Sequence, residues 1–215
     1  MKKACMHIEK DNIKAEINKK MVGSLGLLSV VVLLVALAIF GSVNREFSFF
    51  NDFISKLGAK GEPHAIWWNL IGFIVVGLLL FLFGLLYGIL LNDRLLAVLL
   101  SFFGIGFALT AIPMDMQVSN SPVSKAHIVV VCLGLAFWLF GLARLGYNRR
   151  LEKRIRKRAN ITALILVVSM IGFVLDLWSM PITHRLVFGI VFGWTAITSL
   201  ELLVNKQNSA ARTNP

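Results

Sequence analysis

Three of the four histidines in this 215-residue chain follow an aspartate and a proline at similar spacings. The Asp precedes the His by twelve residues twice and by eight once; the pairs are Asp52 and His64, Asp115 and His127, and Asp176 and His184. Three neutral imidazoles beside a carboxylate suit a tetrahedral zinc ion that keeps an open position for water. The pattern therefore suggests a metal-dependent hydrolase, with the three histidines as zinc ligands, Asp115 or Asp176 as the base, and Ser55 orienting the substrate.

Two other interpretations fit the same residues. Histidines at helix starts lie beside free N–H groups and the positive end of the helix dipole, an arrangement that binds an anion such as a lipid phosphate. Asp, His and Pro are also common at helix ends, where they serve as caps and interfacial residues. Because the chain has no closely spaced ligand pair of the H-x-x-x-H type, the three interpretations stay open.

The elements that carry these residues are strongly apolar. Hydrophobic residues make up 57% of the chain, which has 22 basic and 11 acidic residues and a mean hydropathy of +0.78. Six continuous apolar runs have about the 20 residues that a helix needs to cross a hydrocarbon core. They are residues 22–43, 66–91, 95–113, 127–147, 161–179 and 186–204. The sequence predicts an all-α, polytopic six-helix transmembrane bundle over residues 21–204, with polar tails at 1–20 and 205–215.

The distribution of basic residues predicts the orientation. Of the 22 lysines and arginines, 17 lie in the segments on the side of the N-terminus and five in the opposite loops. This asymmetry is typical of a protein with both termini in the cytoplasm, and we expect the inner membrane of a prokaryote. The basic tract at 149–158 fixes topology or contacts lipid headgroups, and no interleaved aromatic residues indicate nucleic-acid binding.

Two further expectations concern contacts near the predicted outer face. Asp176 lies inside the fifth run, where a bare carboxylate is costly, so we expect it to pair with His184. Phe47, Phe50 and Ile54 share one face of a short predicted helix that would cover the outer mouth of the bundle.

Glycines at small-residue spacing predict close contacts between helices, or between two copies of the chain in a homodimer. The positions are Gly84 and Gly88, Gly104 and Gly106, and Gly189 and Gly193.

The chain also resembles a known family. Residues 54–58 (Ile-Ser-Lys-Leu-Gly), Asn69, the Pro113-x-Asp115 motif and His127 resemble the prokaryotic six-helix membrane proteins of unknown function numbered 998. The resemblance covers about residues 20–204 and implies a six-helix bundle, with Ser55, Gly58, Asn69, Asp115 and His127 at family-type positions. The chain is more loosely similar to membrane-embedded zinc hydrolases such as alkaline ceramidases and adiponectin receptors. It differs from them because it lacks a seventh helix and the closely paired C-terminal histidines.

Three hypotheses for function follow. The first is a non-enzymatic protein that binds a membrane lipid or small ligand at an outward-facing site built from His64, Asn69, Asp115, His127, Asp176 and His184. The second is the zinc-dependent lipid hydrolase. The third is a small transporter acting as a dimer, which the lack of charges near the helix centres disfavours.

Overall fold

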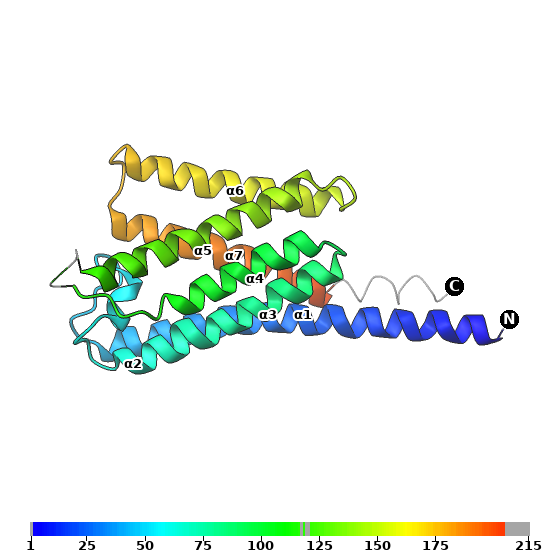
Figure 1. Ribbon diagram of the computed structural model, residues 1–215, viewed down its shortest axis with the longest axis horizontal. Coiled ribbons are helices and arrows are strands. Elements are labelled where there is room, and N and C mark those ends of the chain that lie inside the picture. Colours follow the sequence, from blue (N-terminus) through cyan, green and yellow to red (C-terminus); the bar gives the residue numbers. More distant parts are fainter. Residues whose placement is uncertain (1, 117, 119–120, 205–215) are drawn as a thin grey trace.

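The computed structural model describes residues 2–116, 118 and 121–204, and these residues form helices joined by short connections (Figure 1). The elements are α1 (Lys2–Val43), the 3₁₀ helix η1 (Ile54–Gly58), α2 (Ala65–Trp68), the π-helical segment η2 (Asn69–Val75), α3 (Val76–Leu90), α4 (Arg94–Leu109), α5 (Pro122–Tyr147), α6 (Lys153–Val174) and α7 (Met180–Val204). Segments α2, η2 and α3 follow one another without a break as one apolar helix. The prediction of an all-α chain is confirmed.

The long helices form a closed ring. Contacts join α1 to α3, α3 to α4, α4 to α5, α5 to α6, α6 to α7, and α7 back to α1. One end of the ring carries η1 and the starts of α2, α5 and α7, and we call it the η1 end; the opposite end, with the α5–α6 turn, we call the basic end (Figure 1). Helix α1 begins at Lys2, in the predicted polar tail 1–20, so it extends past the basic end on the N-terminal side of the first apolar run. The other predicted tail, 205–215, lies outside the described residues.

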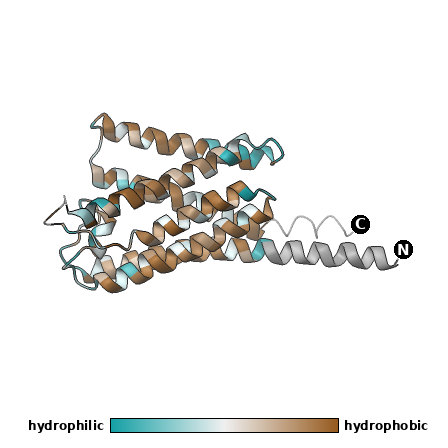
Figure 2. Cartoon of the chain, viewed as in Figure 1, coloured by the Kyte–Doolittle hydropathy of each residue, from teal (hydrophilic) through white to brown (hydrophobic). Residues whose placement is uncertain are grey.

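Five helices within the described residues are long and apolar enough to cross a membrane, and α4 is a shorter apolar helix. Large apolar side chains point outward from the bundle, including Leu34 at 57% exposure, Leu133 at 54% and Leu164 at 63%. Hydrophobic residues dominate the helices, while hydrophilic ones gather at the turns (Figure 2). A surface of this kind is stable in lipid rather than water, so the chain is a multi-pass membrane protein.

The third apolar run is shorter than predicted, because α4 ends at Leu109 rather than at residue 113. The Thr110 hydroxyl donates to the Phe107 carbonyl at 2.5 Å, and the Thr110 N–H donates to Gly106 and Phe107. Three residues after Thr110, Pro113 disfavours helical backbone at the residue before it and has no N–H to donate. At about 1.5 Å per residue, the 16 residues of α4 span about 24 Å.

The predicted starts of three helices were also wrong, because polar residues form their first turns, and α6 begins at Lys153 rather than at residue 161. Helix α5 begins at Pro122, where the Ser121 hydroxyl caps it by accepting from the Ser124 N–H at 3.1 Å. Helix α7 begins at Met180, six residues before its predicted apolar run. His127 and His184 therefore lie in the second turns of α5 and α7 rather than at their first residues.

Aromatic side chains fill the ring between its middle and its basic end. Trp138 of α5 and Trp194 of α7 meet edge to face with centroids 5.9 Å apart, and both are fully or nearly fully buried. Phe83 and Tyr87 of α3 stack on one another at 5.5 Å and contact Trp194. This part of the bundle is a packed core; a void there measures only about 10 Å³.

Two charged contacts tie the basic end together. The buried Asp93 carboxylate accepts from Arg144 Nε at 2.8 Å and Asn148 Nδ2 at 3.0 Å, and it caps α4 by accepting from the Leu96 N–H at 3.1 Å. Burial raises the pKa of Asp93, but these hydrogen bonds and the Arg144 charge outweigh it, and the net pKa lies below the usual value. Glu201 of α7 pairs with Arg154 and Arg158 of α6.

Glycine spacing predicted contacts for only some of the pairs. A Cβ on Gly84 would lie 2.6 Å from the carbonyl carbon of Leu100, so α3 and α4 approach closely there, and Gly88 and Gly104 make similarly tight contacts. By contrast, a Cβ on Gly189 or Gly193 would meet no described atom within 4 Å. The prediction of an intrachain contact is wrong for that pair on α7, and a homodimer through it stays a prediction.

Candidate functional site

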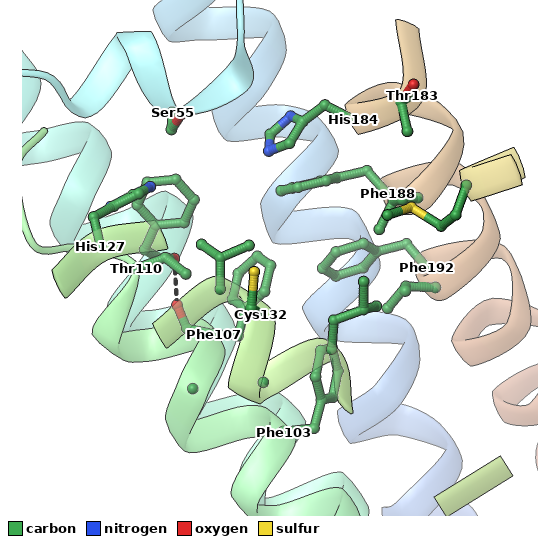
Figure 3. Close-up of a pocket in the computed structure, with 18 of the residues that line it drawn as sticks. Ser55, Phe103, Phe107, Thr110, His127, Cys132, Thr183, His184, Phe188 and Phe192 are labelled. Carbon is green, nitrogen blue, oxygen red and sulfur yellow. Dashed lines mark hydrogen bonds between the residues drawn. The ribbon is translucent and has the colours of Figure 1, made fainter. Parts of the chain in front are cut away.

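A cavity of about 180 Å³ lies inside the ring at the η1 end (Figure 3). Most of its wall is apolar and comes from α4, α5 and α7, with single residues from η1, η2 and α6. Its lining residues are Ser55, Phe73, Phe103, Gly106, Phe107, Thr110, His127, Val131, Cys132, Gly134, Leu135, Met170, Met180, Thr183, His184, Val187, Phe188, Val191 and Phe192. Neither acidic nor Lys or Arg side chains occur among these described lining residues.

His127 is buried on the α5 side of the cavity. Its Nδ1 lies 2.9 Å from the carbonyl oxygen of Ile112, in the connection after α4. Because a carbonyl only accepts, Nδ1 carries the proton and donates it, and in the neutral ring Nε2 is then an acceptor. The bond also anchors the α4–α5 connection to α5, so His127 has both a structural contact and a place in the cavity wall.

His184 faces the cavity from α7, opposite His127 in Figure 3. The centroid of its ring lies 4.8 Å from that of Phe188 and 5.9 Å from that of Phe53, and the His184 and Phe53 rings are nearly perpendicular. Its Nδ1 atom is buried, and no hydrogen-bond partner for it is found among the described residues. A buried polar atom without a partner is costly in a folded protein and calls for an explanation, such as a ligand group.

Ser55 of η1 contributes a hydroxyl from the roof of the cavity. The loop before it is not the helix that the sequence predicted over 47–54; it consists of turns, with Phe47 and Ile54 buried but Phe50 79% exposed. The 3₁₀ helix begins only at Ile54. The loop nevertheless covers the η1 end of the ring, as the prediction had it.

Arg185, next to His184, ties this loop to α7. All three of its guanidinium nitrogens donate to backbone carbonyls: Nε to Phe49, Nη1 to Pro181 at 2.7 Å, and Nη2 to Asp52 at 2.6 Å and Ser48 at 3.3 Å. Four carbonyls thus surround one cation, and no carboxylate oxygen takes part in these bonds. Arg185 therefore holds the loop that covers the cavity against α7.

Asp52 stabilises the same loop from within. Its carboxylate accepts from the Ser48 N–H at 2.8 Å and pairs with Lys56 Nζ at 3.0 Å. Burial raises the pKa of Asp52, but the Ser48 N–H and the Lys56 and Arg185 charges outweigh it, so the net pKa is below the usual value. Asp52 is therefore a charged structural residue of the loop.

Asn69, a predicted ligand-binding residue, lies outside the cavity wall. Its amide Nδ2 donates to the Gly58 carbonyl at 2.9 Å, which attaches η1 to the start of the π-helical segment. A Cβ on Gly58 would collide with Asn69 Oδ1, so a larger residue there would have to displace the Asn69 amide. These two family-type positions form a clamp that sets the position of Ser55.

Asp115 also lies outside the cavity wall, in the α4–α5 connection. Its Oδ1 accepts from the Val118 N–H at 3.1 Å, its own N–H donates to Ser124 Oγ at 3.1 Å, and its carboxylate lies 3.7 Å from Lys60 Nζ. Asp115 therefore organises a connection and links it to the segment after η1.

Asp176 is not inside a helix as predicted. Helix α6 ends at Val174, and the N–H groups of Asp176 and Leu177 bond back to Phe173 and Gly172. This is a Schellman cap, in which Asp176 adopts the left-handed conformation with φ of 54°. The side chain of Asp176 is exposed at the turn, so it needs no buried partner. The expected pairing of Asp176 with His184 is therefore wrong, and the Nδ1 atom of His184 has no hydrogen-bond partner among the described residues.

The three predicted zinc ligands do not come together. His64 is the exposed N-terminal cap residue of α2, with φ of 57°, whereas His127 and His184 face the cavity. Throughout the described part of the chain, His, Cys, Asp and Glu form no group of three or more that could hold a metal ion. The residues that the zinc hypothesis requires are therefore not arranged for it.

Sequence reasoning missed most of the cavity wall. A usable signal exists, because residues four apart lie on one helical face. On α7 this spacing joins His184 to Phe188 and Phe192, and on α5 it joins His127 to Val131 and Leu135, all of them lining residues. Extending a stripe from each histidine would have found two walls of the cavity.

The fold and the cavity define a class: a multi-pass helical membrane protein with an apolar internal cavity at one end of its ring. A family model described as "Protein of unknown function (DUF998)" matches residues 27–204. The chain belongs to this DUF998 family, as the resemblance in its motifs indicated. Neither the curated proteins nor the solved structures contain a match.

Proposed function

We propose that this protein binds a membrane lipid, whose polar end sits among Ser55, His127 and His184 while its chain occupies the apolar cavity. The observation that carries the proposal is the combination of an apolar cavity with a buried, unpartnered His184 Nδ1 at its polar end, as far as the described residues go. The two together match an amphiphile, because the wall suits hydrocarbon and the imidazole suits a polar group.

The volume of the cavity supports a site that holds only part of a lipid molecule. Apolar cavities of roughly 150 Å³ hold a molecule the size of benzene. At about 180 Å³, this one takes a polar end and several carbons of a chain, and the rest must continue outside. An acyl chain that begins in the cavity and ends in the bilayer fits this limit.

The exposed members of the wall support access from the bilayer. Cys132 of α5, Met170 of α6 and Met180 of α7 line the cavity and are also exposed residues. Cys132 lies ten residues after the start of α5, which is about 15 Å along the helix. An opening at that depth faces hydrocarbon.

The orientation we propose follows from charge. Six helices, including the short α4, cross the inner membrane of a prokaryote, and both termini lie in the cytoplasm with the basic end. The η1 end and its cavity then face outward. A lipid of the outer leaflet is the occupant that this orientation favours.

Neither alternative function has comparable support. Zinc-dependent hydrolysis lacks a converging ligand set among the described residues. Transport needs a polar path, whereas the half of the ring toward the basic end is filled by Trp138, Trp194 and Tyr87. Lipid binding without chemistry is therefore the function we propose.

A pair of valines on α5 provides the test. Val131 lines the cavity, and Val129 is 54% exposed on the outer surface of the same helix. The change Val131→Phe fills the cavity, so we expect several-fold less lipid to remain on the purified protein, measured by mass spectrometry of extracted lipids. Val129→Phe adds the same volume outside and should retain the wild-type amount. Equal lipid retention in both variants and in the wild type would contradict the proposal.

A further inference from the structure

From the hydrogen-bonding capacity of the cavity, we infer that the bound lipid carries an uncharged hydroxyl group at its polar end, rather than a phosphate or an ammonium group. This inference rests on the proposed function and adds the chemical class of the ligand.

The first step concerns cations. The described lining residues include neither Lys nor Arg, and the neighbouring Arg185 uses all three guanidinium nitrogens on backbone carbonyls of the roof and of α7. An anionic headgroup entering the cavity would leave water without a compensating charge. Burial of an unpaired charge is strongly unfavourable, so a phosphate does not match this wall.

The second step concerns anions. Each nearby carboxylate is placed elsewhere: Asp52 bonds within its loop, Asp115 bonds within the α4–α5 connection, and Asp176 is exposed at the α6–α7 turn. None of the three is among the lining residues. An ammonium headgroup therefore has no described counter-charge in the wall.

The third step counts donors and acceptors at the polar end. Three lining groups already donate their protons to backbone carbonyls: Thr110 Oγ1 to Phe107, Thr183 Oγ1 to Ser179 at 3.1 Å, and His127 Nδ1 to Ile112 at 2.9 Å. The capacity that these three groups retain is to accept, and a ligand made only of acceptors, such as a phosphate dianion, cannot use it; the Ser55 hydroxyl can either donate or accept.

The fourth step concerns His184. Its buried Nδ1 either accepts or donates, depending on which ring nitrogen carries the proton. A hydroxyl satisfies both forms, because it can donate to a bare nitrogen and accept from a protonated one. The uncharged hydroxyl is thus the group that fits the whole polar end without a buried net charge.

The experiment uses Cys132 as a reporter at the mouth of the cavity. The chain has two cysteines, so Cys5→Ser leaves Cys132 as its single thiol. Its rate of reaction with a maleimide is measured in detergent micelles in the presence of four compounds that share one oleyl chain. These are oleyl alcohol, 1-O-oleylglycerol, oleyl phosphate and oleylamine.

We expect the two hydroxyl compounds to slow the reaction at concentrations about tenfold lower than the phosphate and the amine, a ratio equivalent to about 1.4 kcal/mol. His184→Leu should remove this discrimination, whereas His184→Gln, which keeps a donor and an acceptor, should preserve much of it. The comparison among ligands on the Cys5→Ser protein stands even if a His184 variant does not fold.

The outcomes separate the two proposals. If none of the four compounds protects Cys132, the proposed lipid site is wrong, and this inference falls with it. If the charged compounds protect as well as or better than the hydroxyl compounds, the lipid site stands and the inference is overturned. Unchanged discrimination in a folded His184→Leu protein would also overturn it.

Discussion

At the scale of single residues, Gly58 and Asn69 set the roof of the cavity. The Asn69 amide donates to the Gly58 carbonyl at 2.9 Å, and a Cβ on Gly58 would overlap Asn69 Oδ1 as the amide now lies. We expect Gly58→Ala to lower the melting temperature of the purified protein, because the clamp must open to admit the methyl group. Gly189→Ala is the matched control, since its Cβ meets no described atom and Ala favours helix by about 1 kcal/mol over Gly. A Gly58→Ala protein that melts like the wild type would refute the clamp.

The candidate site was only partly predictable from residue types. The histidine pattern led to His127 and His184, and Ser55 was predicted both to orient a substrate and to occupy a family-type position, because such polar residues are scarce in an apolar chain. The prediction that aspartates line the site was wrong for Asp115 and Asp176. Spacing in sequence does not reveal that Asp176 is the left-handed residue of a Schellman cap. The unpartnered state of His184 Nδ1 depends on what packs around it from distant parts of the chain, and a sequence does not contain that information directly.

At the scale of elements, the existence of the helices was predictable but several of their ends were not. Apolar length located all six runs, because lipid requires backbone hydrogen bonds to close within each segment. The ends depend on local polar groups, such as the Ser121 cap that starts α5 and the Thr110 hydroxyl near the end of α4. Because α5 begins at Pro122, His127 lies in its buried second turn rather than at the predicted start of the helix.

Asp93 provides a test at this scale, because it joins the α3–α4 turn to the end of α5. Replacing it as Asp93→Asn keeps a capping side chain but removes the charge that Arg144 and Asn148 contact. We expect a loss of about 1.5 to 3 kcal/mol at neutral pH, the usual contribution of hydrogen bonds to a charged group. Thermal unfolding in detergent would measure it, with exposed Glu152→Gln as the control.

The pH dependence of this effect has a defined sign. The pKa of Asp93 is lowered from its ordinary value of 3.8 in the folded protein, so its contribution is fully present above that value. As the pH falls through the lower, folded pKa, the carboxylate is protonated and the contribution disappears. The melting temperatures of the wild type and Asp93→Asn should therefore converge in acid. A difference that grows as the pH falls would contradict this role.

At the scale of the whole molecule, a closed ring of helices is packed solid on one side and hollow on the other. Trp138 and Trp194 fill the half toward the basic end, while the cavity occupies the η1 end and has the exposed Cys132 in its wall. This shape can hold part of a lipid, whereas the described side chains that fill the half toward the basic end are mainly aromatic. Binding of lipid from the membrane in this cavity is the central claim of the function we propose.

Photo-crosslinking in intact membranes tests that claim most directly. Cells producing the protein are supplied with a fatty acid that bears a diazirine on its chain, so that their lipids become crosslinkers, and labelled peptides are mapped by mass spectrometry. We predict strong labelling of cavity residues such as Val131, Val187 and Phe188, and its loss in the Val131→Phe variant. Labelling confined to outward-facing residues such as Leu133 and Leu164, unchanged by Val131→Phe, would contradict the claim.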